Sequence, residues 1–338
     1  MCVRCRSHIF AFSFVCQVSP TGNLRLAENC FEILAMLGFY LAEEQVSQLP
    51  RLRQVFENAL KKGAQLDRAG ARVLASAIKA VGRLMVALQK AEQVEVFHPL
   101  IPLMLASLMQ VLKHKLENES ILILQVMAEI AEEYARFFKP HLEQLLNVLA
   151  QISVSEFVHE VEPKIRHLAV EIIVLLAERA PVMARTMPGN KFVLTALEAV
   201  LKLMMDQEDD PEWALRDDLE DEDMDDDGGD VGCGAIQRLA TAIRAKKFIR
   251  PALVAVRKWT ASPDWRCRSA ALLALSQVRR GCHFPMFTLQ CSFEVTTPRQ
   301  TIAKCLLCSF VCFLLLLRVL VVVLSLDRRV VFIRLVNS

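Results

Sequence analysis

The sequence predicts an all-α protein built from stacked pairs of helices, and three observations lead to this prediction. Apolar residues recur at spacings of three and four along most of the chain, and helix start and stop signals bracket these runs. Similar runs return after roughly 45 residues, a period typical of helical repeats. Only eleven Gly and two Tyr occur, and Val- or Thr-rich alternating stretches are rare before residue 284, so β-structure has little support.

The helical periodicity is clearest in the middle of the chain. The stretch ENESILILQVMAEIAEEYARFF places Ile123, Met127, Ile130, Tyr134 and Phe138 on one stripe of a helix. The stretch EPKIRHLAVEIIVLLAERAP repeats this arrangement about one period later. Each of these helices therefore has an apolar side that needs a partner.

Proline and glycine mark the ends of the predicted helices. Pro163 suits a first helical turn, because its missing N–H would have no partner there. Pro181 follows a helix that must stop. The stretch SPDWRCRSAALLALSQVRRG opens with Ser and Pro and ends at Gly281, which are helix start and stop signals.

The predicted helices form pairs. We expect a single helix at roughly 24–40, followed by pairs at roughly 46–62 with 69–89, 97–113 with 119–137, 139–152 with 163–179, 190–205 with a partner that begins near Gly234, and 247–260 with 264–280. Paired helices at this period indicate a HEAT or armadillo array. Because no pair can bury its apolar faces alone, stacked pairs must share one continuous core.

Three of the predicted second helices carry an arginine early, at Arg72, Arg166 and Arg268. An arginine at such a position usually pairs with nearby groups. We therefore expect these three residues to tie neighbouring turns of the repeats together.

One segment breaks the helical pattern. From Asp206 to Asp230 there are fifteen Asp or Glu and one Arg, a charge of −14, so the rest of the chain carries +16 to give the net +2. Two interpretations stay open, a solvated loop or a surface for basic partners. Fifteen carboxylates would each need pairing to be buried, so we expect the segment to stay extended and wet.

Metal and catalytic motifs are incomplete. Asp223, Asp225, Asp227 and Gly228 resemble the start of a calcium loop, but the twelfth position, which needs a bidentate Glu, is Gly234. The stretch HEVEP begins like a zinc-protease helix but has Pro where the second His is needed. No phosphate loop or nucleophile with a positioned base is recognisable. The eleven Cys form no disulfide framework, which favours a reducing compartment. We expect no enzyme activity, no cofactor and no metal.

The last part of the chain differs in composition. CLLCSFVCFLLLLRVLVVVLSL, from Cys305 to Leu326, is apolar with Arg318 inside. It is long enough for a membrane helix, and leucine and valine could offset one arginine. The alternative is a gene-model artefact. We therefore divide the chain into an unassigned segment at 1–22, a repeat array at 23–283 with an acidic loop at 206–233, and an apolar tail at 284–338.

Two stretches carry a resemblance to a known family. MMDQEDDPEWALRDDLEDEDMDDDGGD, followed by SPDWRCRSAALLALSQVRRGCH, resembles the middle of a karyopherin-β of the importin-5 (importin β-3) type. The matching residues are Trp213 and Ala214 in the acidic loop and Pro263, Asp264, Trp265, Arg268, Ala270, Leu272, Ala274, Leu275, Ser276, Gly281, Cys282 and His283 after it. The resemblance covers roughly Ala27 to His283, and it adds Trp265 to the structural residues of the repeat.

The resemblance implies a fold, a function and partners. Members of this family are all-α HEAT-repeat solenoids, right-handed superhelices of antiparallel helix pairs, that carry cargo through nuclear pores under the control of the GTPase Ran. Cargo signals are basic, so the resemblance implies cargo binding by the acidic loop, where Trp213 would stack on a partner or anchor the loop. The residues assigned to partner binding are Glu208, Asp209, Asp210, Trp213, Asp217, Asp218, Glu220, Asp221, Glu222, Asp223, Asp225, Asp226 and Asp227.

The departures from the family pattern limit these expectations. The family grips Ran mainly through further N-terminal repeats, and residues 1–22 resemble none of them, which puts Ran binding by this chain alone in doubt. We expect basic nuclear-localisation-type cargo as partners, no nucleic acid, contact with a membrane only if the tail is real, and a location in cytoplasm and nucleus. The alternative function is a generic HEAT-repeat scaffold, membrane-anchored through the apolar tail.

Overall fold

The computed structural model describes residues 23–44, 46–63, 68–154, 162–205 and 228–282. The chain divides into two compact units, Met1–His283 and Phe284–Ser338, and every described residue belongs to the first. These residues form helices and short connections, with no strand among them. The all-α prediction is therefore confirmed. None of the helices in these ranges is long and apolar enough to cross a membrane.

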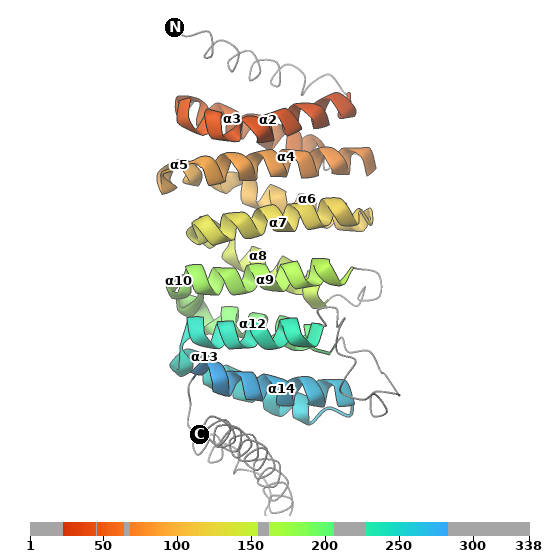
Figure 1. The fold of residues 1–338 in the computed structure, drawn as a ribbon, viewed down its shortest axis with the longest axis vertical. Coiled ribbons are helices and arrows are strands. Elements are labelled where there is room, and N and C mark those ends of the chain that lie inside the picture. The colour runs from red at the N-terminus through yellow and green to blue at the C-terminus, as the bar shows by residue number, and fades with distance from the viewer. Residues whose placement is uncertain (1–22, 45, 64–67, 155–161, 206–227, 283–338) are drawn as a thin grey trace, which may run out of the picture. The chain divides into compact units, whose positions relative to one another are not determined.

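The helices form two layers, and the first layer faces the viewer in Figure 1. Each of its helices packs against the next one in the layer. Its members are α2 (Leu24–Glu44), α4 (Arg68–Ala87), α7 (Glu117–Tyr134), α9 (Pro163–Arg179), α12 (Gly228–Ile243) and α14 (Trp265–Cys282).

The second layer supplies one partner for each first-layer helix after α2. Its members are α3 (Leu49–Gly63), α6 (Ile101–Lys113), α8 (Leu142–Val154), α11 (Lys191–Leu203) and α13 (Ala245–Thr260). The pairs are α3 with α4, α6 with α7, α8 with α9, α11 with α12, and α13 with α14, and successive second-layer helices also touch. This is the stacked-pair architecture of a HEAT-repeat solenoid, as predicted.

Short elements connect the long helices. They are η1 (Val46–Gln48), α5 (Ala91–Glu95), η2 (His98–Leu100), η3 (Ala135–His141), α10 (Pro181–Thr186) and η5 (Pro188–Asn190). The tightest connection is Arg244, the single residue between α12 and α13. Its φ of 70° lies in a region that residues other than glycine seldom adopt, so the corner is held by the packing of the two helices.

The start of α12 differs from the prediction. The helix begins at Gly228 rather than near Gly234, because the glycines of its first two turns weaken the sequence signal. The first turns of α12 also pack closely against the residue that follows α11. A Cβ added at Gly232 would lie 2.2 Å from Cγ of Met204 at the end of α11, so only glycine allows this close approach.

The core runs without interruption through both layers. Near the start of four second-layer helices lies a phenylalanine that is fully buried: Phe97, Phe138, Phe192 and Phe248. Phe31 and Phe56 pack together where α2 meets α3, with ring centroids 5.9 Å apart. Cys30 is also buried in α2, and this burial raises the pKa of its thiol. The shared core that the repeat pattern requires is thus filled mainly by Leu, Ile, Val and Ala, with fully buried phenylalanines at intervals along it.

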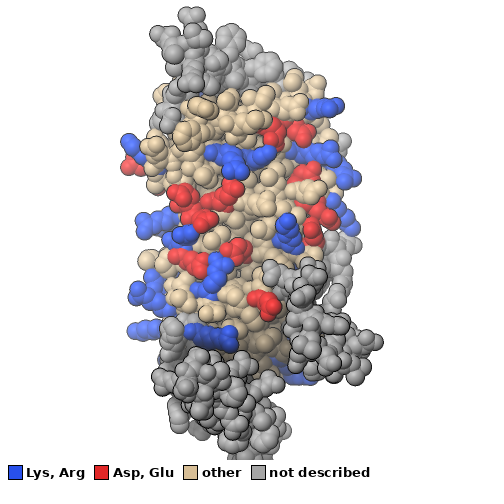
Figure 2. All heavy atoms as spheres, viewed as in Figure 1, with Lys and Arg blue, Asp and Glu red and all other residues tan. Residues whose placement is uncertain are grey.

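Ion pairs connect the first-layer helices to one another, and red and blue side chains lie side by side over the middle of this face in Figure 2. Every step from α2 to α12 has at least one. They are Lys79 Nζ to Glu32 Oε2 at 2.6 Å, Arg72 Nε to Glu119 Oε1 at 3.3 Å, Arg83 Nη1 to Glu129 Oε2 at 3.7 Å, Arg179 Nη2 to Glu132 Oε1 at 2.6 Å, and the pairs of Arg238.

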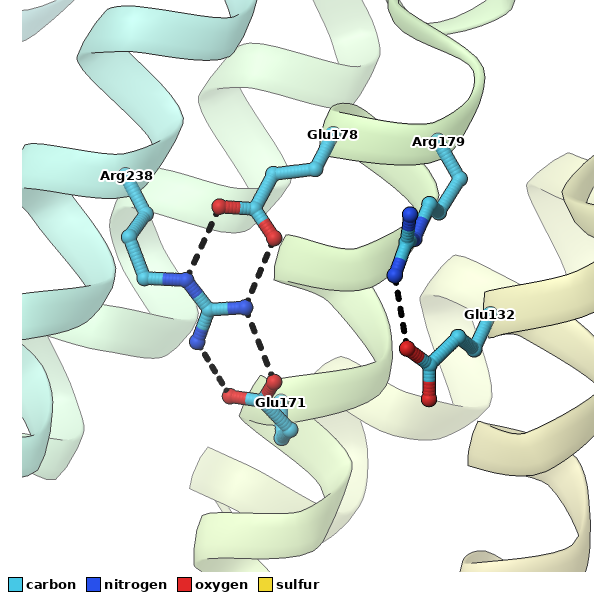
Figure 3. Close-up of polar contacts among 5 residues, drawn as sticks. All are labelled: Glu132, Glu171, Glu178, Arg179 and Arg238. Carbon is cyan, nitrogen blue, oxygen red and sulfur yellow. Dashed lines mark hydrogen bonds and ion pairs between the residues drawn. The ribbon is translucent and has the colours of Figure 1, made fainter.

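Arg238 makes the most extensive of these contacts (Figure 3). Its Nε and Nη2 donate to Glu178 Oε1 and Oε2 at 2.9 and 2.7 Å, and its Nη1 and Nη2 donate to Glu171 Oε2 and Oε1 at 2.7 and 2.9 Å. The hydrogen bonds to Glu178 and then to Glu171 raise the pKa of Arg238 above its usual range. The planar guanidinium therefore joins α12 to two positions on α9 that lie two turns apart, in a fixed geometry.

Removing a buried ring should destabilise the array. Phe192→Ala in α11 should lower the free energy of unfolding by about 3–5 kcal/mol, because it removes a fully buried side chain from a site that cannot collapse completely. Urea denaturation followed by circular dichroism measures this loss. The matched control is Leu194→Ala in the same helix, which is 48% exposed and should change the value by about 0.5 kcal/mol or less. Equal losses would contradict the assignment of Phe192 to the core.

Removing the guanidinium of Arg238 should weaken the contact between α9 and α12. Arg238→Met should cost about 1–2 kcal/mol, a figure kept low because the side chains involved are more than one-third exposed. Hydrogen exchange of the α12 amides measures the local effect. Arg83→Met is the control, since its single contact is long and should contribute almost nothing. A loss in the control as large as in Arg238→Met would show that the bidentate geometry is unimportant.

Candidate functional site

The acidic segment assigned to partner binding lies outside the described residues. All thirteen assigned residues fall between 206 and 227, the range that separates Met205 from α12. Within the described part, only Asp230 of the acidic run is present, and it is exposed. The binding role of the segment therefore stays a prediction.

The four residues assigned to the structural repeat are all described, and they lie in different surroundings. Arg72 reaches Glu119 on the next first-layer helix. Arg166 is 3% exposed in the first turns of α9. Arg268 Nη1 donates to the carbonyl oxygens of Ser262 and Pro263 at 3.0 and 2.6 Å, which fastens the turn before α14. The repeat therefore uses its arginines in three different ways.

The fourth of these residues, Trp265, begins α14. It is 42% exposed, and the guanidinium carbon of Arg266 lies 5.8 Å from the centre of its ring. The contact lies at the distance of a cation–π interaction.

The strongest candidate site is a hollow on the first layer, where α2, α4 and the end of α7 meet. It has a volume of about 580 Å³, and its lining combines apolar side chains, among them Met36, Phe39 and Val86, with the charged side chains of Arg83 and Glu133. Met36 and Phe39 are 74% and 59% exposed, which is unusual for large apolar side chains. An apolar side chain of a partner would cover surface here that is now in contact with water.

The far wall of the hollow is formed by the end of α7. Tyr134 donates a hydrogen bond from its hydroxyl to the carbonyl oxygen of Leu88, which fixes the connection after α4. Burial, and then the nearby charge of Glu133, raise the pKa of Tyr134. Tyr134 therefore keeps its proton and is uncharged at neutral pH, and its role in the wall of the hollow is structural.

The hollow is lined by one cation and one carboxylate, Arg83 and Glu133, and Arg83 is paired with Glu129 of α7. Glu129, Glu132 and Glu133 all lie in the second half of α7, and the last turn of the helix has no basic residue. Carboxylates at a helix C-terminus are unfavourable for the helix, because its dipole places partial negative charge there. Glu129 and Glu132 are paired with Arg83 and Arg179. Glu133 is exposed and forms no ion pair among the described residues.

Sequence reasoning did not find this site. The helical pattern placed Tyr134 on the apolar stripe of α7, but nothing in the spacing shows that the ends of three helices from different repeats meet. One signal was present, because three glutamates in five residues at the end of a helix run against the usual preference.

Two protein-family models match the chain. An "Importin repeat" model matches residues 158–250, and a model described as "IPO5-like, TPR repeats" matches residues 9–148. The second match begins at residue 9, inside the segment 1–22 that the sequence left unassigned.

Two curated relatives are importins. Importin subunit beta-3 of Saccharomyces cerevisiae is 24% identical over 265 residues, and a probable importin-5 homologue of Dictyostelium discoideum is 27% identical over 278 residues. These matches cover 78% and 81% of this chain. The chain spans about a quarter of the relatives' length, 23% and 24% respectively.

Solved structures share the fold. A crystal structure of a Kap121p mutant matches with a TM-score of 0.68 and 21% identity, over 85% of this chain and 26% of that one. Kap121p bound to RanGTP matches with a TM-score of 0.65 and 24% identity, over 80% of this chain and 25% of that one. These structures show the shared solenoid fold. The two importin models, which together match residues 9–148 and 158–250, and the two importin relatives identify the chain as a member of the karyopherin-β family, of the importin-5 type.

Proposed function

We propose that this chain provides repeats of a nuclear transport receptor that bind basic segments of cargo proteins, in the cytoplasm and in the nucleus. The observation that carries the proposal is the first-layer hollow, where exposed apolar side chains lie beside the carboxylate of Glu133. Kap121p has been crystallised bound to Pho4p and to RanGTP, which supports a receptor role for the related repeats.

The hollow suits a segment that contains both an apolar residue and a lysine or arginine. The apolar side chain would cover Met36 and Phe39, which supplies the hydrophobic part of the affinity. The cation would lie next to Glu133 at the negative end of the α7 dipole. A segment of lysines alone could use only the second of these contacts.

The acidic segment would act on the approach of such cargo. Its charge of −14 between residues 206 and 230 attracts cations from a distance, and this speeds encounter more than it tightens the final complex. The attraction is screened over about 8 Å at physiological ionic strength. Trp213 lies in this segment and would contact a bound partner or hold the segment to the array.

Neutralising the acidic segment should slow association. A variant with Asp217, Asp218, Asp221, Asp223 and Asp225 changed to Asn should bind a labelled peptide of alternating lysine and leucine about tenfold more slowly at low salt. The dissociation rate should change little, because the loss concerns the approach. Stopped-flow fluorescence at two salt concentrations measures both rates. Association that is unchanged and independent of salt would contradict the role of the segment and favour a generic scaffold.

Reversing the charge beside the hollow should weaken the complex itself. Glu133→Lys should lower the affinity for the same peptide about tenfold, because a cation then meets a like charge at the end of α7. Fluorescence anisotropy measures the equilibrium. Glu198→Lys on second-layer α11 is the control, since the glutamate is also exposed and changes the net charge equally. If both variants bind alike, the hollow is not the cargo site.

A further inference from the structure

The second layer carries a charged surface of the opposite sign on α13. Five cations and no carboxylate occur in its sixteen residues. We call Lys246, Lys247, Arg250, Arg257 and Lys258 the basic stripe, and each of these residues is exposed.

The basic stripe lies on one side of the helix. At 3.6 residues per turn its members fall within an arc of about 120°, and they extend over about 18 Å of helix. The opposite side is buried through Phe248, Pro251, Ala252 and Val256. Val254 lies in the middle of the stripe and is 66% exposed. The outward surface is thus a row of cations on both sides of one apolar side chain.

The cations of the basic stripe differ from those of the first layer in their ion pairs. There, Lys79, Arg83 and Arg238 each pair with a glutamate on a neighbouring helix. Within the described part of the chain, none of Lys246, Lys247, Arg250 and Lys258 forms an ion pair.

Three of these cations are placed against the preference of the helix, whereas Arg257 and Lys258 lie in its last turn, where positive charge is favourable. Lys246 and Lys247 lie in the first turn, where the helix dipole disfavours positive charge. Arg250 follows them at spacings of four and three, at which like charges repel. Features that break local rules without a gain for the fold are expected at functional surfaces.

We propose that the basic stripe of α13 binds an acidic polypeptide segment with an apolar residue between its acidic residues. An extended segment of about five or six residues would span the stripe, since a strand advances about 3.3 Å per residue. Its carboxylates would lie against the cations, and its apolar side chain against Val254. This partner differs from the basic cargo of the first-layer hollow, so the inference does not depend on that function.

Nucleic acid fits the stripe less well. Binding of single strands relies on aromatic side chains that stack on bases, and no member of the stripe is aromatic. Phosphates would gain nothing from an exposed valine in the centre of the surface. A polypeptide can supply both the negative charges and the apolar contact.

The test uses the complete chain and a fluorescein-labelled peptide of alternating glutamate and leucine. Fluorescence anisotropy should show binding that weakens with salt. Lys247→Glu with Arg250→Glu should lower the affinity about tenfold or more. The matched control is Lys62→Glu with Lys113→Glu, two exposed cations of second-layer helices α3 and α6, which should change it less than twofold. Absence of binding, or equal loss in both double variants, would overturn the proposal.

Two further measurements make the test specific. Val254→Ser should weaken binding of the peptide about threefold and leave binding of an oligo(dT) control unchanged. If oligo(dT) binds more tightly than the peptide and depends on the stripe, the partner is a nucleic acid and the polypeptide assignment is wrong. The titrations are repeated on a variant in which Asp and Glu between 217 and 227 are changed to Asn and Gln. This change prevents the acidic segment of the chain from competing with the peptide for the basic stripe.

Misfolding can be separated from loss of the surface. Lys247→Glu places a carboxylate near the N-terminus of α13, which should leave the helix as stable as before or slightly more stable. A melting temperature at or above that of the unsubstituted chain, together with lost peptide binding, supports the proposal. If the double variant melts lower, the single variants Arg250→Gln and Lys258→Gln each have to lower the affinity at an unchanged melting temperature, and the proposal fails if they do not.

Discussion

Burial of each helix by its neighbours is the constraint on which the structure depends. No described pair encloses a core of its own, because the buried side chains of one repeat are covered by the helices of the next. The fully buried phenylalanines show the consequence, since they recur near the start of successive second-layer helices. The free energy of unfolding is therefore approximately a sum over the repeats and the contacts between neighbouring repeats, so the loss of one repeat destabilises those beside it.

Charged contacts have a different part in this arrangement. Apolar packing alone would tolerate small shifts of one helix along the next, whereas the guanidinium of Arg238 meets two glutamates that are two turns apart on α9. Contacts of this kind fix the register more than they stabilise, because they are partly exposed to water. At the end of α7, Glu129 and Glu132 take part in such contacts, whereas Glu133 forms no ion pair with another described residue.

Much of the array could be predicted from the sequence, because apolar spacing and proline or glycine punctuation are local signals. The ranges expected for α3, α6, α9 and α13 agree with the structure to within a few residues. The start of α12 could not be predicted, since glycine has low helix propensity and the close approach of Gly232 to Met204 is a tertiary contact. The hollow and the contacts of Arg238 depend on which helices are neighbours in the fold. The spacing of residues within one helix does not identify those neighbours. The thirteen acidic-loop assignments stay predictions, because their residues lie outside the described ranges.

The buried thiol of Cys30 offers a chemical probe for the packing of α2 against its neighbours. Cys30 is 3% exposed, and burial raises the pKa of its thiol, so the thiol is both shielded and protonated. An alkylating reagent reacts with the thiolate, and it can therefore modify Cys30 only when α2 moves away from the core. The modification rate would then be set by the opening equilibrium of this first helix. A ligand that bridges α2 and α4 would hold α2 in place and would therefore slow the modification of Cys30.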